Sequence, residues 1–291
     1  MLKIQSLASG SKGNCTFVSN GSVRLLVDVG LRLPQLLARL ESANIKPESI
    51  SGILITHEHS DHIVGVWGFI KRFGCKLYVH ESAKTCFLEK IGGLDEDLIV
   101  TFRNEFVING RCECVVVCEC NLPKGKCRCV TFCDCEVLGL VVDSFPVPHD
   151  SNFCFGYTFK CGESKFSLAT DLGTCSDATL QKMAGSQVVL LESNHCPVKL
   201  RANVKYPSWL KSRVAGSHGH LSNADCGRAI YKLASMGVEQ VILAHLSEEN
   251  NSPSLAYRVV KDFLEEKGLI EGEDIFIDVA EQNKVGKLIE M

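Results

Sequence analysis

The sequence predicts an α/β protein in which two β-sheets pack face to face between outer helices, an αβ/βα four-layer sandwich. Two observations predict this fold. Each half of the 291-residue chain combines strands linked by short turns with strands that alternate with helices. Apolar residues make up 45% of the chain and charged residues 22%, so a large core can form and a disordered chain is excluded.

The first half is predicted to open as a β-meander, because a Gly/Ser loop at 9–14 and an Asn20-Gly21 turn separate three apolar runs. Pro34 suits the first position of a helix, and Gly92-Gly93 suits the end of another. The predicted elements are strands at 2–8, 15–19, 22–29, 52–56 and 76–79 and helices from about 34, at 63–73 and at 81–91.

The second half is predicted to be rich in strands before helices return. The predicted elements are strands at 98–102, 105–109, 136–144, 153–160, 165–169, 187–191, 238–243 and 274–279 and helices at 176–184, 206–212, 222–236 and 253–267. No stretch between the halves has the Pro, Gly and Ser content of a linker, so we expect one domain over residues 1–291.

Charge and hydropathy narrow the range of partners. The chain has 31 Lys and Arg against 34 Asp and Glu, a net charge of -3, so any site for a polyanion such as nucleic acid must be local. The opening residues MLKIQSLASG lack the apolar run of a signal peptide, and nowhere do 18 apolar residues follow one another. We therefore expect a cytoplasmic protein without a membrane partner.

The strongest chemical signal is HEHSDH at 57–62, directly after a predicted strand. His57 and His59 point the same way in an extended loop, so two imidazoles can hold one ion. Asp61 and His62 lie at the start of the next helix and can face a second ion, as in two-metal hydrolases.

Three further candidate ligands follow predicted strands: His149 in FPVPHD, Asp171 in SLATDLG and His245 in VILAHLSEENN. A single histidine after a strand is more often a surface or core residue. Together with HEHSDH, however, strand-end His, Asp and His are what a site built from loops at one edge of a sandwich requires.

The HEHSDH motif with these three residues, in this order, resembles the metallo-β-lactamase fold superfamily, and Asp28 in LLVDVG resembles its buried first aspartate. The likeness spans nearly the whole chain. More narrowly, the chain resembles the YycJ branch of bacterial metallohydrolases, also called WalJ, through SGSKGNCT, ESNH, YPSWLKSR, GHLSN and AHLSEENN.

The resemblance implies two divalent ions, Zn or Mn or Fe, with His57, His59 and His149 on one ion, Asp61, His62 and His245 on the other, and Asp171 bridging both. It implies that Asp28 holds a ligand loop or orients a ligand imidazole, and a strand-end capping acid is an equal alternative. A hydroxide shared by the ions would attack the substrate, since each ion lowers the pKa of water from 15.7 toward about 7.

A metal-bridged hydroxide suits phosphodiesters but also lactones, thioesters and strained amides. His220 in GHLSN resembles the histidine with which tRNA-processing nucleases of the superfamily contact the phosphate or protonate the leaving oxygen. A histidine at a helix start is the structural alternative. His195 in ESNH is a second catalytic candidate, and we expect Asp61 to serve the reaction as well as the ion.

A basic segment also favours a nucleic-acid substrate, because cations with aromatic residues between them can follow a phosphate backbone and stack a base. It contains Tyr206 and Trp209, and its substrate-binding candidates are Lys199, Arg201, Lys211 and Arg213. A solvated helix face is the alternative. In the loop 9–14, Ser11 and Asn14 are candidates to meet a phosphate, although a Gly/Ser turn forms without any ligand.

The resemblance to the YycJ branch implies a DNA exonuclease acting from the 5′ end. The chain departs from the branch at Cys196, where an acid commonly follows ESNH. A small-molecule hydrolase of the same fold, such as a lactonase or cyclic phosphodiesterase, is the alternative enzyme. A redox or metal sensor is the alternative outside enzymes. The oligomeric state is left open.

Half of the 16 cysteines fall in an insert at about 111–136, in which C-x-C-x3-C-x-C occurs twice, symmetrically about residues 121–126. This symmetry predicts a β-hairpin with all eight thiols on one face, either free, bridged as disulfides or bound to a soft ion. The eight residues are Cys112, Cys114, Cys118, Cys120, Cys127, Cys129, Cys133 and Cys135.

Overall fold

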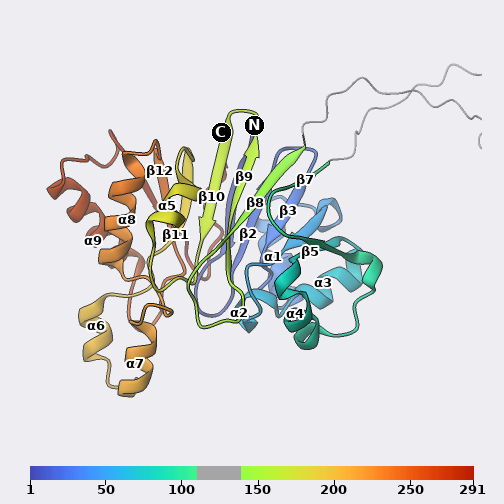
Figure 1. Ribbon diagram of the computed structural model, residues 1–291, viewed down its shortest axis with the longest axis horizontal. Coiled ribbons are helices and arrows are strands. Elements are labelled where there is room, and N and C mark those ends of the chain that lie inside the picture. Colours follow the sequence, from blue (N-terminus) through green and yellow to red (C-terminus); the bar gives the residue numbers. More distant parts are fainter. Residues whose placement is uncertain (110–138) are drawn as a thin grey trace, which may run out of the picture.

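The computed structural model describes residues 1–109 and 139–291, and these residues form two seven-stranded mixed sheets (Figure 1). The strand order is β14-β1-β2-β3-β4-β5-β6 in the first sheet and β13-β12-β11-β10-β9-β8-β7 in the second. Helices cover the outer face of each sheet, so the predicted α/β sandwich is confirmed. The predicted cysteine hairpin lies outside the described residues.

The strands of the first sheet are β1 (Lys3–Ala8), β2 (Cys15–Ser19), β3 (Arg24–Val27), β4 (Gly52–Leu54), β5 (Lys76–His80), β6 (Ile99–Phe102) and β14 (Ile289–Glu290). The strands of the second are β7 (Phe106–Ile108), β8 (Leu140–Pro146), β9 (Phe155–Cys161), β10 (Ser164–Ala169), β11 (Val188–Glu192), β12 (Gln240–Ala244) and β13 (Phe276–Val279). The helices are α1 (Leu33–Ser42), α2 (Ser60–Ile63), α3 (Val66–Phe73), α4 (Lys84–Ile91), α5 (Asp177–Met183), α6 (Pro197–Ala202), α7 (Ser208–Val214), α8 (Asn223–Ala234) and α9 (Pro253–Glu266).

The alternation of side chains along each strand builds the layers. In β11, Val188 and Leu190 join the core between the sheets, while Val189 and Leu191 join the core beneath α5, α8 and α9. In β3, Leu26 faces the core beneath α1, α3 and α4. Because both faces of these strands are buried, their sequences are continuous apolar runs rather than alternating ones.

Two predicted helices differ from the structure. The predicted helix at 63–73 is two helices, α2 and α3, because the chain turns at Gly65, where a Cβ atom would lie 2.0 Å from the carbonyl oxygen of Leu31. The predicted helix at 81–91 opens with a 3₁₀ turn at Glu81–Ala83. Two short elements, α6 and β14, were not predicted, and β14 gains its strand form by pairing with β1.

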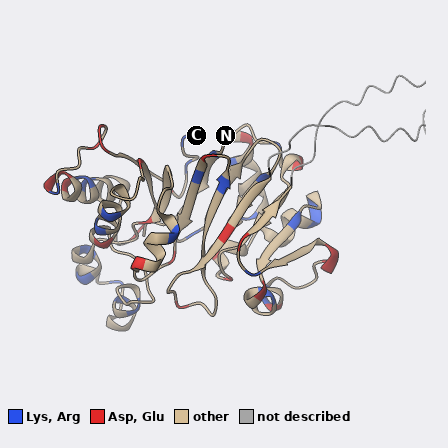
Figure 2. Cartoon of the chain, turned by 45° about the horizontal axis from the view of Figure 1, so that its top comes forward, with Lys and Arg blue, Asp and Glu red and all other residues tan. Residues whose placement is uncertain are grey.

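The surface carries both signs of charge. Lys and Arg lie among Asp and Glu over the outer helices of both halves (Figure 2). The termini lie together at the end of the sandwich opposite α2 (Figure 1). No helix among residues 1–109 and 139–291 is long and apolar enough to cross a membrane.

Candidate metal centre

Five chemically active side chains stand at the carboxyl ends of parallel strands. Strands β3 and β4 run parallel in one sheet, and β10, β11 and β12 run parallel in the other. Asp28 follows β3, His57 follows β4, Asp171 follows β10, Glu192 ends β11 and His245 follows β12. Because parallel strands end at the same edge of a sheet, these residues converge at one end of the sandwich.

The backbone at this edge is strained. Among the described residues, Asp28, Asp171 and His245 are three of the four non-glycine residues with positive φ, at 61°, 58° and 53°. The left-handed conformation costs about 1–2 kcal/mol per residue. Such outliers persist where the surrounding structure holds them, and they cluster at functional sites.

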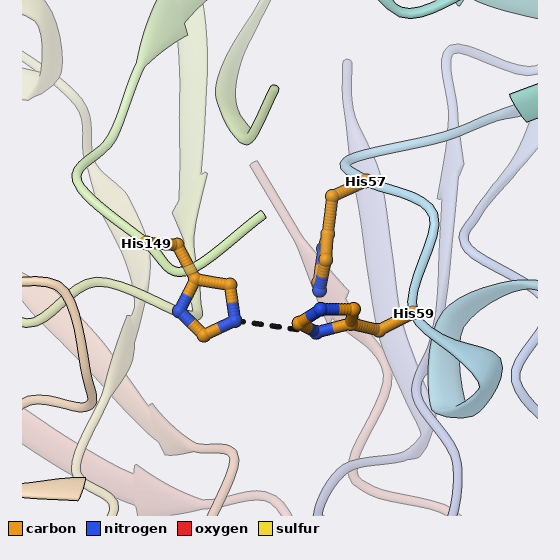
Figure 3. Close-up of side chains that lie close together, drawn as sticks. All are labelled: His57, His59 and His149. Carbon is orange, nitrogen blue, oxygen red and sulfur yellow. Dashed lines mark hydrogen bonds between the residues drawn. The ribbon is translucent and has the colours of Figure 1, made fainter. Parts of the chain in front are cut away.

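His57 and His59 come from one loop, and His149 faces them from the segment after β8 (Figure 3). One ligand nitrogen from each ring lies within 4.8 Å of the others. His149 Nε2 lies 3.3 Å from His59 Nδ1, while His149 Nδ1 donates to the carbonyl oxygen of Gly219 at 3.1 Å. The three rings can therefore present nitrogens to one cation.

A second group combines Asp61, His62 and His245, whose ligand atoms also lie within 4.8 Å of one another. Asp61 Oδ2 is 3.5 Å from the Nε2 atom of each histidine. Asp171 lies between the two groups, with Oδ2 at 3.2 Å from His62 Nε2 and Oδ1 at 3.7 Å from His149 Nε2. The two oxygens of Asp171 thus face both groups.

Unpaired buried atoms test whether these residues fit a metal. His57 Nε2, Asp171 Oδ2 and His245 Nε2 are buried without a hydrogen-bond partner. Leaving such atoms unpaired is costly, whereas imidazole nitrogens and carboxylate oxygens are ligands of Zn, Mn and Fe. The residues therefore fit divalent ions, which would satisfy all three atoms at once.

Asp28 fixes the orientation of two ligand rings. Its Oδ2 accepts hydrogen bonds from His62 Nδ1 at 2.7 Å and from Thr56 Oγ1 at 2.8 Å. Thr56 Oγ1 lies 3.0 Å from His57 Nδ1 and accepts its proton. With their Nδ1 atoms hydrogen-bonded in this way, both rings can present Nε2 to an ion.

Glu192 is a site residue that the sequence reasoning missed. It is fully buried. Its Oε1 accepts from His220 Nδ1 at 2.8 Å and His245 Nδ1 at 2.7 Å, and its Oε2 accepts from the backbone N–H groups of Leu172 and Leu221 at 2.9 and 3.0 Å. Burial raises the pKa of Glu192, but His220 and His245 outweigh it and bring the pKa to about 2. The sequence feature that could have revealed Glu192 is its position at the end of β11, because β11 lies between β10 and β12, the strands that lead to Asp171 and His245.

The buried carboxylates also raise the pKa values of two histidines. Burial lowers the pKa of His245, but Asp171, Asp61 and Glu192 outweigh it and raise the pKa to about 10. Burial likewise opposes the charge on His62, and Asp171, Asp28 and Asp61 raise its pKa well above 6.5. Without a cation, the protons on these rings balance the buried carboxylates.

The catalytic candidates occupy different places. The ring of His220 lies beside the cluster, with its centroid 5.2 Å from that of His149 and 5.3 Å from that of His245. His195 is buried, forms a backbone bridge with Ser222, and its Nδ1 has no hydrogen-bond partner. Burial lowers the pKa of His195, and the nearby Glu192 opposes this shift.

The loop 9–14 contributes Asn14 to the site. Asn14 Nδ2 lies 3.0 Å from His62 Nε2 and donates to the carbonyl oxygen of Gly10 at 3.1 Å. The Asn14 side chain therefore closes the loop and borders the cluster. Ser11 is exposed on the same loop.

The basic candidates lie on α6 and α7. Arg213 ends α7 and pairs with Asp150, the neighbour of His149, and it lines a pocket of about 650 Å³ together with His59 and Asp61. Lys199 Nζ donates to the carbonyl oxygen of Asn251 and Lys211 Nζ to that of Arg201. Among the four basic candidates, Arg213 is thus the one that lines the pocket beside the cluster.

Comparisons with known proteins agree on one family. The sequence profile of the metallo-beta-lactamase superfamily matches residues 8–111. The chain is 33% identical over 273 residues to exodeoxyribonuclease YycJ of Bacillus anthracis, covering 94% of this chain and 92% of that protein. It is 32% identical over 277 residues to exodeoxyribonuclease WalJ of Streptococcus pneumoniae strain D39, covering 94% and 91%.

Solved structures show the same fold at low sequence identity. The metallo-beta-lactamase fold protein YhfI of Bacillus subtilis aligns with a TM-score of 0.64 and 14% identity, covering 98% of both chains. Zn²⁺-bound PqqB of Methylobacterium extorquens aligns with a TM-score of 0.64 and 13% identity, covering 99% of this chain and 100% of that one.

Proposed function

Because the chain belongs to the metallo-β-lactamase superfamily, as a metal-dependent hydrolase related to YycJ and WalJ, we propose that it is an exodeoxyribonuclease with two divalent ions. The observation that carries the proposal is the relatedness to two exodeoxyribonucleases over 94% of the chain. The gathered His and Asp ligand atoms support it, since a hydrolase of this type needs them.

In this proposal the two groups of ligands keep the roles that the family resemblance implies. His57, His59 and His149 would hold one ion, Asp61, His62 and His245 would hold the other, and Asp171, which faces both groups, would contribute to both. When bound, the ions supply an activated water and offset negative charge on the phosphoryl group. Asp28 and Glu192 keep the ligand rings in the tautomer and orientation that binding requires.

His220 protonates the leaving oxygen. Its Nδ1 proton is held by Glu192, so Nε2 is the atom that can serve the substrate. Burial lowers the pKa of His220, but Glu192 and Asp171 outweigh it and raise the pKa above its usual 6.5, which favours the protonated ring. A side-chain exposure of 23% leaves the ring within reach of a bound substrate.

The DNA strand runs past α6 and α7. In Figure 1 these helices lie to one side of α2, which carries Asp61 and His62. The cations proposed to contact the phosphates are Lys199, Arg201 and Lys211. Contacts of this kind go to the phosphates and carry no sequence preference, as an exonuclease requires.

The test is digestion of end-labelled DNA by the protein loaded in turn with Zn, Mn and Fe. We expect stepwise shortening with at least one metal, and the position of the label gives the polarity. His57→Ala should abolish digestion, whereas His218→Ala, an exposed histidine outside the ligand groups, should leave it intact. Turnover of lactones by metal-loaded protein that leaves DNA uncut would assign a small-molecule substrate instead.

A further inference from the structure

A pocket of about 650 Å³ opens beside the ligand cluster, lined by residues of α2, α3 and α4 and by Arg213 of α7. His59 and Asp61 form one wall. Its volume falls within the roughly 300–1,000 Å³ typical of small-ligand sites. A group bound in this pocket would therefore lie directly beside any phosphate held at the cluster.

Another part of the pocket lining is apolar and partly aromatic. It consists of Ile63, Val64, Trp67 and Ile91. Trp67 and Val64 are each 49% exposed, although tryptophan is usually well buried in a folded protein. An indole left open on a pocket wall offers a flat surface on which a planar ring can stack.

The charges of the pocket favour an uncharged occupant on this wall. Lys90 Nζ lies 3.6 Å from Glu58 Oε1, and Arg213 pairs with Asp150, so each cation of the pocket already faces an acid. A phosphate would gain little from cations that are neutralised in this way. The negative group of a ligand belongs at the ligand cluster, and its neutral ring belongs on Trp67.

From this arrangement we infer that the pocket holds the base of the terminal nucleotide of the DNA strand, stacked on Trp67, while the scissile phosphate lies at the His and Asp cluster. The inference rests on the proposed nuclease function. Stacking on an aromatic ring tolerates every base, so the pocket selects a strand end without selecting a sequence.

The first experiment compares two oligonucleotides that differ at the digested end, one with a terminal base and one with a terminal abasic residue. In the metal-loaded wild type, we expect a KM about tenfold higher for the abasic substrate with little change in kcat. Trp67→Ala should show the higher KM on both substrates, and Trp67→Phe should keep most of the difference. Tyr231→Ala, which removes an exposed aromatic residue on α8, should keep all of it.

The outcomes separate the two proposals. If the wild type digests neither oligonucleotide with any metal, the nuclease function fails. If it digests both with the same KM, the nuclease function stands and the base pocket is overturned.

The second experiment reads binding without any metal. The chain has two tryptophans, so Trp209→Phe leaves Trp67 as the sole indole emitter. In the presence of chelator, deoxyadenosine monophosphate should quench Trp67 emission, and deoxyribose 5-phosphate should not. The emission of Trp209 in Trp67→Phe should not change. Unchanged Trp67 emission, or quenching by an aryl ester and not by the nucleotide, would overturn the inference.

Discussion

Replacing Glu192 with glutamine tests the buried hydrogen bonds that support the metal centre. Glu192 accepts four N–H groups, with the two histidine rings on Oε1 and two backbone amides on Oε2. Glutamine has one oxygen and one NH₂ group. In either orientation of the amide, two buried N–H donors would face another donor.

The size of the effect follows from these contacts. Each buried donor left unpaired costs about 1–3 kcal/mol, so two cost about 2–6 kcal/mol of the free energy of unfolding. Losing the negative charge beside two histidines acts in the same direction. Because Glu192 also orients His245, we expect metal affinity to fall by roughly 10–100-fold.

Urea unfolding of the metal-free proteins measures the loss of stability, and competition with a chelator measures the loss of metal affinity. The matched control is Glu266→Gln, an exposed glutamate on α9, which should change neither quantity. A loss of stability below about 1 kcal/mol, together with unchanged metal affinity, would refute the role that we give to Glu192.

Four further predictions concern the ligands and their surroundings. Since carboxylates raise the pKa of His62 well above 6.5 and that of His245 to about 10, metal binding at pH 7.5 should release protons, measurable by calorimetry in buffers of different ionisation enthalpy. The same raised pKa values stabilise the metal-free fold below about pH 6.5, and this stability should be lost as the pH rises toward 10. The urea midpoint of unfolding should therefore fall over that pH range, and a constant midpoint would contradict the pKa shifts. Asp28→Asn should weaken metal binding by roughly 10–100-fold, while the far-UV circular dichroism spectrum should change little. Metal binding at wild-type affinity would contradict the orienting role of Asp28. Gly65→Ala should destabilise the fold by about 1–3 kcal/mol, because the added Cβ atom would clash with the carbonyl oxygen of Leu31. Gly68→Ala is the control and should not destabilise the fold, because an added Cβ atom there would lie 3.7 Å from its nearest neighbour, Leu33 Cβ. Equal urea midpoints for the two variants would exclude the clash.

Much of the candidate centre could be located from local sequence. HEHSDH stands directly after an apolar strand, and His149, Asp171 and His245 each follow one. These patterns reveal which side chains are available at strand ends. They predicted the group of residues that the structure gathers around Asp171.

Other features depend on contacts between distant segments. Glu192 reads as the last residue of an apolar strand, and its four donors come from three separate parts of the chain. Trp67 reads as a residue of an amphipathic helix, and its exposure on a pocket wall depends on α2 and α4. No local pattern encodes such neighbours, so sequence reasoning missed both residues.

The sequence by itself determined the type of fold and the set of candidate metal ligands, because strand periodicity, turn residues and strand-end histidines are local properties. Tertiary structure alone decided which of those side chains lie together, which carboxylates hydrogen-bond to them, and where a pocket opens beside them. Those choices are set by distances and burial, and both arise only when the two sheets pack together and bring the ends of their parallel strands to one edge.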